Sequence, residues 1–239
     1  KQKRRRRIGV IAVAAVVLIG AGVLLLLTGG DDAPDDQIAA GEDAVDAAQP
    51  VASCEAAGEL VDEPKTYEAP GDGGLGGAAA ATFTFATNCG EIVISADAAA
   101  APDTVNAMAF LANDEYFNNT LCHRVTTDGI FVLQCGDPTA SGTGGPGFTL
   151  PDENRPGDTV LNYPAGTVAM ANSGPGTAGS QFFIVYGNTT LPASYTVWGT
   201  VTSGLDVVAE VAEAGTVDGS TDGAPLQAVM IQRALAEPQ

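Results

Sequence analysis

The residues of this sequence that could do chemistry gather around its only histidine, in LCHRVTTDGIFVLQCGD (residues 121–137). Arg124 follows His123 directly, and Cys122 and Cys135 lie on either side of this pair. Three roles are open for the group: a metal site, a structural ion pair, or an arginine that acts on a substrate. A zinc site, and with it a zinc hydrolase, is disfavoured, because such sites usually need a close cysteine pair such as C-x₂-C.

Two further stretches combine glycines with polar side chains. In GTVAMANSGPGTAGSQFFIVYG (166–187), Asn172 and Gln181 flank a Gly/Pro/Thr loop that leads into an apolar run. DPTASGTGGPGFTLPDE (137–153) is glycine-rich but lacks the lysine of a phosphate-binding loop, so we expect no nucleotide site. A single imidazole and no recognisable serine elbow leave no nucleophile–base pair. One arginine, two amide side chains and several large apolar residues instead suit a neutral peptide.

Short strands and two helices must position these residues. Helical spacing of apolar residues predicts helices over 102–117 and 204–214, and a proline and an aspartate suit the first turn of the former. Many short strands with glycine-rich turns favour a mainly β fold, a closed barrel with helical caps. The predicted strands are 81–87, 91–96, 121–125, 130–134, 166–171, 180–186, 195–201 and 226–234.

The N-terminus predicts a membrane anchor ahead of this domain. KQKRRRR (1–7) is followed by an apolar stretch (8–28) whose first twenty residues carry no charge, enough for about 30 Å of helix. This stretch is longer than the apolar region of a cleavable signal peptide. We therefore expect a single-pass cell-membrane protein with a cytoplasmic basic tail and an extracytoplasmic domain over 81–236.

The intervening segment (29–80) is rich in Asp, Ala, Gly and Pro, and we predict a disordered linker. All 29 acidic residues lie beyond residue 30, against four basic ones, so nucleic acid is excluded as a partner. Four cysteines indicate an oxidising compartment and two disulfides. Cys122 could bond Cys135 if both lie on adjacent strands of a hairpin, leaving Cys54 for Cys89, but the sequence alone leaves the pairing open.

Residues 81–235 resemble the cyclophilins, a family of peptidyl-prolyl cis–trans isomerases. HRV…FVLQCGD is similar to the family pattern H-R-[IV]…F-x-x-Q-G-G-D, and AMANSGPGTAGSQFFI is nearly identical to its most distinctive segment. The resemblance implies a closed antiparallel eight-stranded β-barrel with two capping helices. The alanine- and glycine-rich, lysine-poor composition is typical of a high-GC bacterium, such as an actinobacterium.

The resemblance also assigns roles to individual residues. The catalytic arginine falls on Arg124, and His123 is a candidate accessory residue. The expected proline pocket consists of Phe131, Val132, Phe183, Leu191 and Tyr195. The residues expected to bind the substrate backbone are Gln134, Ala171, Asn172 and Gln181.

This chain departs from the family pattern in three places. The spacing from His123 to Gln134 is longer than usual, so residues 126–130 must loop out. Cys135 replaces the first glycine of Q-G-G-D, and Thr190 stands where a tryptophan often contacts cyclosporin. We expect peptide binding to survive these changes.

We therefore predict a peptidyl-prolyl isomerase that acts on proline-containing polypeptides folding outside the membrane, needs neither cofactor nor metal, and works as a monomer. An arginine beside an apolar pocket would favour the twisted amide without covalent chemistry. The alternative is a non-catalytic proline-peptide binding module or chaperone with the same fold.

Overall fold

The computed structural model describes residues 54–239. The predicted basic tail (1–7), the predicted membrane helix (8–28) and the first part of the predicted linker lie outside the described residues. Between residues 54 and 239, no helix has both the length and the apolar character needed to cross a membrane.

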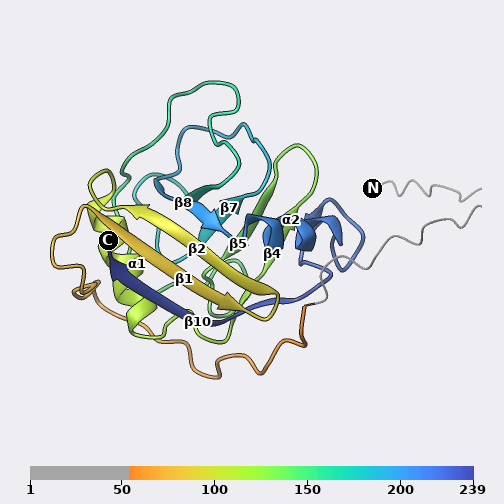
Figure 1. Cartoon of the computed structure of the whole chain (residues 1–239), viewed down its shortest axis with the longest axis horizontal. Coiled ribbons are helices and arrows are strands. Elements are labelled where there is room, and N and C mark those ends of the chain that lie inside the picture. The colour runs from red at the N-terminus through yellow and green to blue at the C-terminus, as the bar shows by residue number, and fades with distance from the viewer. Residues whose placement is uncertain (1–53) are drawn as a thin grey trace, which may run out of the picture. The chain divides into compact units, whose positions relative to one another are not determined.

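A single curled antiparallel sheet forms most of the domain (Figure 1). In Figure 1 the gold strand β1 lies between the yellow strand β2 and the dark-blue C-terminal strand β10, so the two ends of the domain sequence meet in the sheet. The strands, in spatial order, are β3 (Thr120–Cys122), β10 (Val229–Pro238), β1 (Ala80–Thr87), β2 (Gly90–Asp97), β8 (Val197–Ser203), β6 (Thr167–Met170), β7 (Phe182–Val185), β5 (Val132–Cys135), β4 (Arg124–Thr126) and β9 (Asp222–Gly223).

The strand count differs from the predicted eight for two reasons. Residues 120–126 form two short strands that are interrupted at His123, where a single strand was expected. The first of them, β3, pairs with β10, and the second, β4, pairs with β5, so this one segment joins both sides of the sheet and closes the barrel. The other addition is β9, only two residues long, which pairs with β4.

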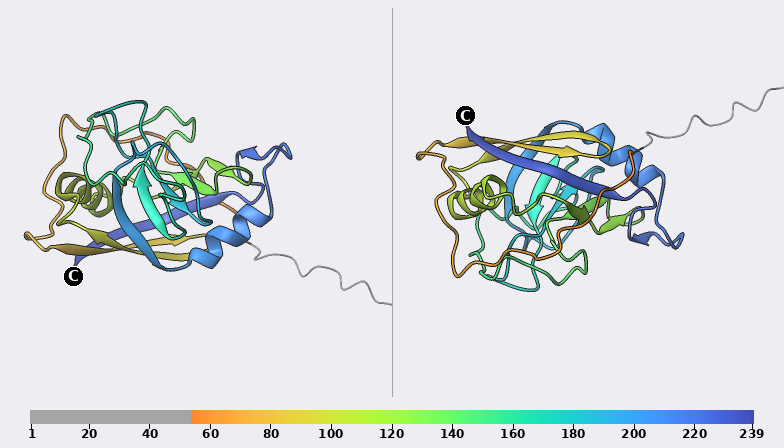
Figure 2. Two further views of the ribbon diagram at one scale, coloured as in Figure 1. Left: turned by 90° about the horizontal axis from the view of Figure 1, so that it is seen from above. Right: turned by 90° about the horizontal axis from the view of Figure 1, so that it is seen from below.

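Two helices lie at opposite ends of the sheet, as both views in Figure 2 show. They are α1 (Pro102–Asn113) and α2 (Leu205–Glu213). Helix α1 ends before the predicted residue 117, because Glu115 adopts a left-handed backbone conformation with φ 60°. No side chain caps the N-terminus of α1 from the residue before it. Instead Glu153 accepts hydrogen bonds from the backbone N–H groups of Asp103 and Thr104 at 3.1 and 2.8 Å.

The barrel interior is built by alternation along the strands. In β1 every second residue is buried, which sends Phe83 and Phe85 inward and Thr82 and Thr84 outward. Trp198 is fully buried and makes edge-to-face contact with Phe83 and Phe182, with centroid separations of 5.1 and 6.0 Å. Trp198 belongs to β8, within the strand that the sequence predicts over residues 195–201.

Residues 54–79 form no helix or strand, yet they follow the surface of the domain. The Nζ of Lys65 and the hydroxyl of Tyr67 donate to the carboxylate of Asp114 at 3.1 and 2.7 Å. The amide of Asn106 receives the N–H of Gly73 at 2.9 Å. The composition of this segment predicts a loose linker, but in the structure its C-terminal part is held against the domain by these specific contacts.

Both disulfides that the sequence left open are formed. Cys54 is bonded to Cys89, and Cys122 is bonded to Cys135. The second bond joins the ends of β3 and β5, although these two strands do not pair directly as a hairpin. Disulfides of this kind persist in oxidising compartments, which supports a domain that lies outside the cytoplasm.

Candidate active site

A row of polar side chains runs across the outer face of the sheet from β4 to the glycine-rich loop. Arg124 and Gln134 are register partners in β4 and β5, and Arg124 Nη1 donates to Gln134 Oε1 at 3.2 Å. Gln134 Nε2 donates to Gln181 Oε1 at 2.8 Å. Gln181 Nε2 then donates to the carbonyl of Gly144 at 2.9 Å. Each amide is thus oriented by its neighbour and keeps one further N–H to offer.

The guanidinium of Arg124 has a second partner that the sequence did not reveal. Its Nε and Nη2 donate to the two carboxylate oxygens of Asp222 at 2.7 and 2.8 Å. This hydrogen-bonded ion pair raises the pKa of Arg124, although partial burial acts in the opposite direction. The same contact lowers the pKa of Asp222 below its ordinary value. Arg124 is therefore charged at any physiological pH.

A cavity with a volume of about 290 Å³ lies beside Arg124, and we call it the apolar cavity because most of its lining residues are aliphatic or aromatic. Its wall combines apolar side chains with the guanidinium and two amide side chains. The lining residues are Arg124, Ile130, Val132, Gln134, Ala171, Asn172, Phe183, Leu191 and Tyr195.

The floor of this cavity is a small hydrophobic cluster that is separate from the barrel core. Phe183 meets the ring of Tyr195 edge-on at a centroid separation of 5.4 Å, and Tyr163 lies 6.2 Å from both rings. The hydroxyl of Tyr163 receives the backbone N–H of Tyr195 at 3.2 Å and donates to the carbonyl of Pro192 at 3.2 Å. Tyr163 therefore fixes the turn that carries Leu191 and Tyr195 to the cavity.

Phe131 is a predicted pocket residue that does not line this cavity. Side chains alternate along a strand, and Val132 and Gln134 face the cavity, so Phe131 points to the other face. There its ring lies 5.9 Å from that of Tyr186. The same alternation brings Ile130 into the cavity wall. Ile130 is not among the predicted pocket residues, although it precedes Val132 by two residues and Gln134 by four, the spacing that places side chains on one face.

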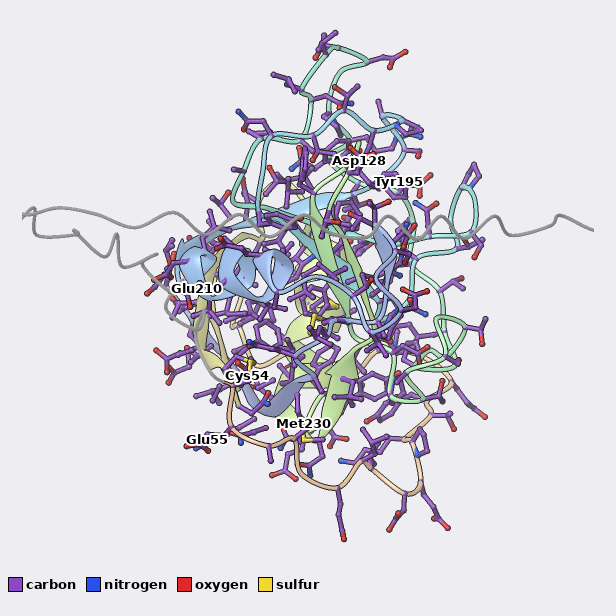
Figure 3. All side chains as sticks on the ribbon, turned by 90° about the vertical axis from the view of Figure 1, so that its right-hand side faces the viewer. Cys54, Glu55, Asp128, Tyr195, Glu210 and Met230 are labelled. Carbon is purple, nitrogen blue, oxygen red and sulfur yellow. A yellow bond between two sulfur atoms is a disulfide. The ribbon has the colours of Figure 1, made fainter. Side chains whose placement is uncertain are left out.

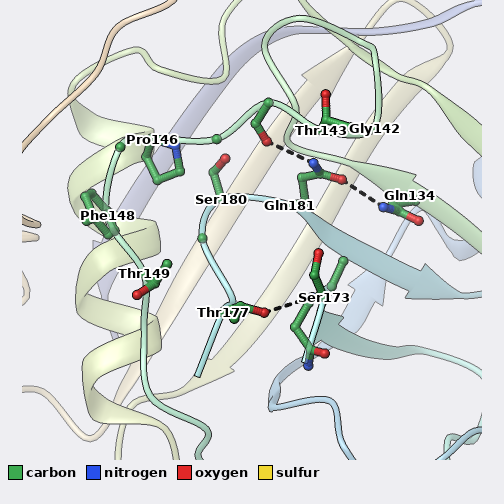
Figure 4. Close-up of a pocket in the computed structure, with 16 residues that line it drawn as sticks. Gln134, Gly142, Thr143, Pro146, Phe148, Thr149, Ser173, Thr177, Ser180 and Gln181 are labelled. Atoms are coloured by element: carbon green, nitrogen blue, oxygen red, sulfur yellow. Dashed lines mark hydrogen bonds between the residues drawn. The ribbon is translucent and has the colours of Figure 1, made fainter. Parts of the chain in front are cut away.

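A second cavity, of about 550 Å³, adjoins the first (Figure 4). The two share Gln134, Ala171 and Asn172. Its other wall is the glycine-rich loop 142–149, and Figure 4 shows the bond between Gln134 and Gln181 at its edge.

Buried Asp137 holds the glycine-rich loop in place. Its carboxylate accepts the N–H groups of Thr139 at 2.7 Å and of Gly144 at 3.0 Å. Burial alone would raise the pKa of Asp137, but these hydrogen bonds outweigh it and keep the pKa below the ordinary value. The carbonyl of Gly144 is thereby positioned to orient Gln181.

His123, a candidate accessory residue, lines neither cavity. Within the described residues, neither of its ring nitrogens has a hydrogen-bond partner. Burial is the main cause that lowers the pKa of His123, and Arg124 adds to the effect while Asp137 opposes it. The metal alternative also loses its ligands, because Cys122 and Cys135 are bonded to each other. In this structure His123 serves as a packing residue under the glycine-rich loop.

Asn172 holds the loop between the cavities through its own side chain. Its Nδ2 donates to the carbonyl of Ser194 at 2.9 Å, and its Oδ1 accepts the N–H of Gly174 at 3.2 Å. The neighbouring Ala171 donates its backbone N–H to the carbonyl of Gln181 at 2.9 Å. The predicted backbone-binding residues are thus gathered in one place, on the boundary between the two cavities.

Comparison with known proteins agrees with this geometry. Residues 82–235 match the family described as "Cyclophilin type peptidyl-prolyl cis-trans isomerase/CLD". The chain is 42% identical over 191 residues to the Mycobacterium leprae protein named "Probable peptidyl-prolyl cis-trans isomerase B", and this match covers 75% of the chain and 63% of the relative. It is 37% identical over 159 residues to "Peptidyl-prolyl cis-trans isomerase-like 1" of Emericella nidulans, covering 65% of the chain and 94% of that protein.

A crystal structure of a Cryptosporidium parvum cyclophilin-type isomerase has the same fold, with a TM-score of 0.57 and 24% identity, over 67% of this chain and 99% of that one. The chain spans 63% of the Mycobacterium leprae relative and 58% of the Mycobacterium tuberculosis one. The family match includes most or all of every strand and both cavities. This chain therefore belongs to the cyclophilin-type peptidyl-prolyl cis–trans isomerase family.

Proposed function

We propose that this chain accelerates the cis–trans exchange of X–Pro bonds in polypeptides that fold outside the cytoplasm. The observation that carries the proposal is a charged guanidinium on the wall of a small apolar cavity that also bears amide side chains. The family to which the chain belongs supports the same reaction.

The difficulty of this reaction lies in amide resonance. The C–N bond has partial double-bond character, so rotation faces a barrier of roughly 18–20 kcal/mol. Uncatalysed exchange of an X–Pro bond consequently takes tens of seconds or more. No bond has to be made or broken, and a catalyst needs only to favour the twisted state.

Arg124 supplies the group that distinguishes the twisted state from the planar one. As conjugation is lost, the imide nitrogen becomes pyramidal and its lone pair is localised there. The distribution of charge over the carbonyl group changes at the same time. A hydrogen bond from Arg124 to either atom is stronger in the twisted state than in the ground state, which is the condition for catalysis.

The apolar cavity holds the proline ring while the preceding residue turns. We assign this role to Val132, Phe183 and Leu191, with Tyr195 closing the wall. The flanking peptide backbone is held by the residues at the boundary of the two cavities, which are Gln134, Asn172 and Gln181 through their side chains and Ala171 through its backbone.

The energies required are within reach of such a site. An acceleration of about 10⁴–10⁵ corresponds to some 5–7 kcal/mol, at about 1.4 kcal/mol per factor of ten. Loss of one preorganised donor typically lowers the rate by about 10²–10³, so one guanidinium can supply roughly half of this. Containment of the proline ring and fixation of the backbone supply the remainder.

We further propose that residues 8–28 anchor the chain in the cell membrane, with residues 1–7 in the cytoplasm. The apolar run and the basic cluster ahead of it support this orientation. The two disulfides support an oxidising location for the domain. Membranes from cells that express the full chain should retain it after an alkaline wash. Release into the wash would contradict the anchor.

Exchange spectroscopy by NMR on an Ala-Pro peptide separates the isomerase from a non-catalytic binding module. We expect catalytic amounts of the full chain to accelerate exchange between the cis and trans signals. A binding module would shift the peptide signals at high protein concentration and leave the exchange rate unchanged, which would refute the proposed reaction.

A further inference from the structure

Asp222 contacts the catalytic candidate Arg124 through both carboxylate oxygens, although 98 residues separate them in sequence. The two hydrogen bonds, at 2.7 and 2.8 Å, form a bidentate pair between the carboxylate and the guanidinium. Such a pair fixes the plane of the guanidinium. Both side chains remain partly exposed, at 36% for Arg124 and 55% for Asp222.

The fold delivers Asp222 to this place by backbone contacts that do not involve its carboxylate. Strand β9 pairs with β4, with Thr126 opposite Asp222, and the N–H of Thr127 donates to the carbonyl of Thr221 at 2.9 Å. The hydroxyl of Ser220 donates to the carbonyl of Asp222 at 2.9 Å. The segment between α2 and β10 is thus a built hairpin, and its position does not depend on the ion pair.

The contact leaves part of the guanidinium free for a substrate. An arginine side chain has five N–H donors in a fixed fork. Asp222 takes two of them and Gln134 takes one, so two remain. Arg124 also lines the apolar cavity, where those remaining donors can reach a bound peptide.

We propose that Asp222 is a positioning residue for the isomerase: it fixes the plane of the Arg124 guanidinium so that the free N–H groups meet the twisting X–Pro bond. This inference rests on the proposed function of the site. Without Asp222, Gln134 alone holds the guanidinium, through one bond of 3.2 Å. A flexible arginine would then spend only part of its time in the productive orientation.

The carboxylate of Asp222 also partly neutralises the guanidinium, which would lower the rate. This effect is smaller than the gain from positioning Arg124. Exposed ion pairs are weakened by water, so the charge of Arg124 is reduced little at this site. Misplacement of a catalytic group by about 1 Å, in contrast, can lower a rate by about 10²-fold.

The test compares Asp222→Ala, Asp222→Glu and a matched control, Asp128→Ala, in the exchange assay with the full chain. Asp128 lies in the exposed loop between β4 and β5 (Figure 3), and its carboxylate makes no hydrogen bond or ion pair among residues 54–239. We expect Asp222→Ala to lower kcat/KM by about 10- to 100-fold. Asp222→Glu should recover part of this loss, and Asp128→Ala should match the wild type.

A spectroscopic readout separates positioning from loss of fold. The Nε–H signal of Arg124 in ¹⁵N NMR should be sharp and protected in the wild type and in Asp128→Ala, and broadened by solvent exchange in Asp222→Ala, while the backbone amide signals stay in place. A rate for Asp222→Ala equal to or above that of the wild type would overturn the inference and leave the proposed function standing. If the wild type itself does not accelerate exchange, the function and this inference fall together.

Discussion

Arg124 and Gln134 face each other across β4 and β5, and their side chains meet in a hydrogen bond of 3.2 Å between Nη1 and Oε1. This relationship joins the group that we propose to act on the amide to the row of amides that we propose to hold the peptide. Residues 127–131 form the loop between the two strands. This loop reverses the chain, so that β4 and β5 pair and both side chains lie on one face. The disulfide between Cys122 and Cys135 closes the same unit on its other side.

The two phenylalanines assigned to the proline pocket should respond differently to truncation. Phe183 lines the apolar cavity, and Phe131 packs against Tyr186 on the other face of β5. We expect Phe183→Ala to lower kcat/KM by about 10- to 100-fold, because lost containment of the proline ring amounts to about 1.4–2.8 kcal/mol. Phe131→Ala should lower the free energy of unfolding by up to about 3 kcal/mol and change kcat/KM little. The reverse order in the exchange assay would show that the cavity has been assigned to the wrong face.

Alternation along β5 explains which parts of the site follow from the sequence. The period of two places Val132 and Gln134 on one face, and it also predicts Ile130 beside them. Only the family resemblance placed Phe131 in the pocket. A resemblance does not show to which face of the sheet a side chain points when the preceding loop is longer than in the family. No local pattern could indicate Asp222, because its contact with Arg124 depends on a hairpin that follows the second helix.

The fold was predictable to a similar extent. Regular alternation marks β1 and β2 correctly, and both helices are where the spacing predicts, whereas β10 alternates irregularly and extends to Pro238, past the predicted residue 234. The number of strands could not be predicted from the sequence. The interruption at His123 and the short strand β9 both depend on pairing partners that are far away in sequence. The composition of residues 54–79 could not reveal that Lys65 and Tyr67 find a common partner in Asp114.

Removal of the Cys122–Cys135 disulfide should affect both stability and catalysis. The bond closes a loop with a sequence separation of 13, so we expect the double alanine variant to lose about 3 kcal/mol in urea unfolding. Because the bond borders Arg124 and Gln134, kcat/KM should also fall at temperatures where the variant is folded.

The Cys54–Cys89 disulfide provides the comparison for that experiment. In Figure 3, Cys54 lies in the lower half of the view and Tyr195, which lines the cavity, in the upper half. The variant that lacks this bond should keep the wild-type kcat/KM. Equal losses of activity in both double variants would contradict a specific role for the bond beside the site.

Glu153 should stabilise the domain through helix α1. It accepts two backbone N–H groups of the first turn and the hydroxyl of Thr104, at 2.7 Å for the last. Loss of such a cap typically lowers stability by about 1–2 kcal/mol, which is the decrease we expect for Glu153→Ala in urea unfolding. Glu237→Ala, an exposed change in β10, should stay within about 0.5 kcal/mol of the wild type. A similar small change for Glu153→Ala would show that the cap carries no stability.

His123 should make the stability of the domain depend on pH. Burial lowers the pKa of His123 in the folded protein from its ordinary value of 6.5, so below pH 6.5 the unfolded chain binds the proton more readily. The contribution of neutral His123 is therefore complete above pH 6.5 and is lost as the pH falls from 6.5 through the lowered pKa.

Urea unfolding at pH 8, 6.5 and 5 measures this effect. The free energy of unfolding of the wild type should fall between pH 6.5 and 5 with a slope of up to about 1.4 kcal/mol per pH unit. His123→Phe removes the titrating ring and should flatten the curve in this range. Asp137, whose pKa lies below its ordinary 3.8, stays ionised over this range, and its contribution to stability is lost only as the pH falls below 3.8. An unchanged slope in the variant would assign the pH dependence to other groups.

The exchange rate of an Ala-Pro peptide with Arg124→Ala, measured beside the wild type under conditions where both are folded, tests the central claim most directly. If the guanidinium favours the twisted amide, the variant should lose about 10²–10³-fold in kcat/KM, while near-native affinity for the peptide shows that the cavity is intact. A variant that catalyses exchange as fast as the wild type would contradict the account.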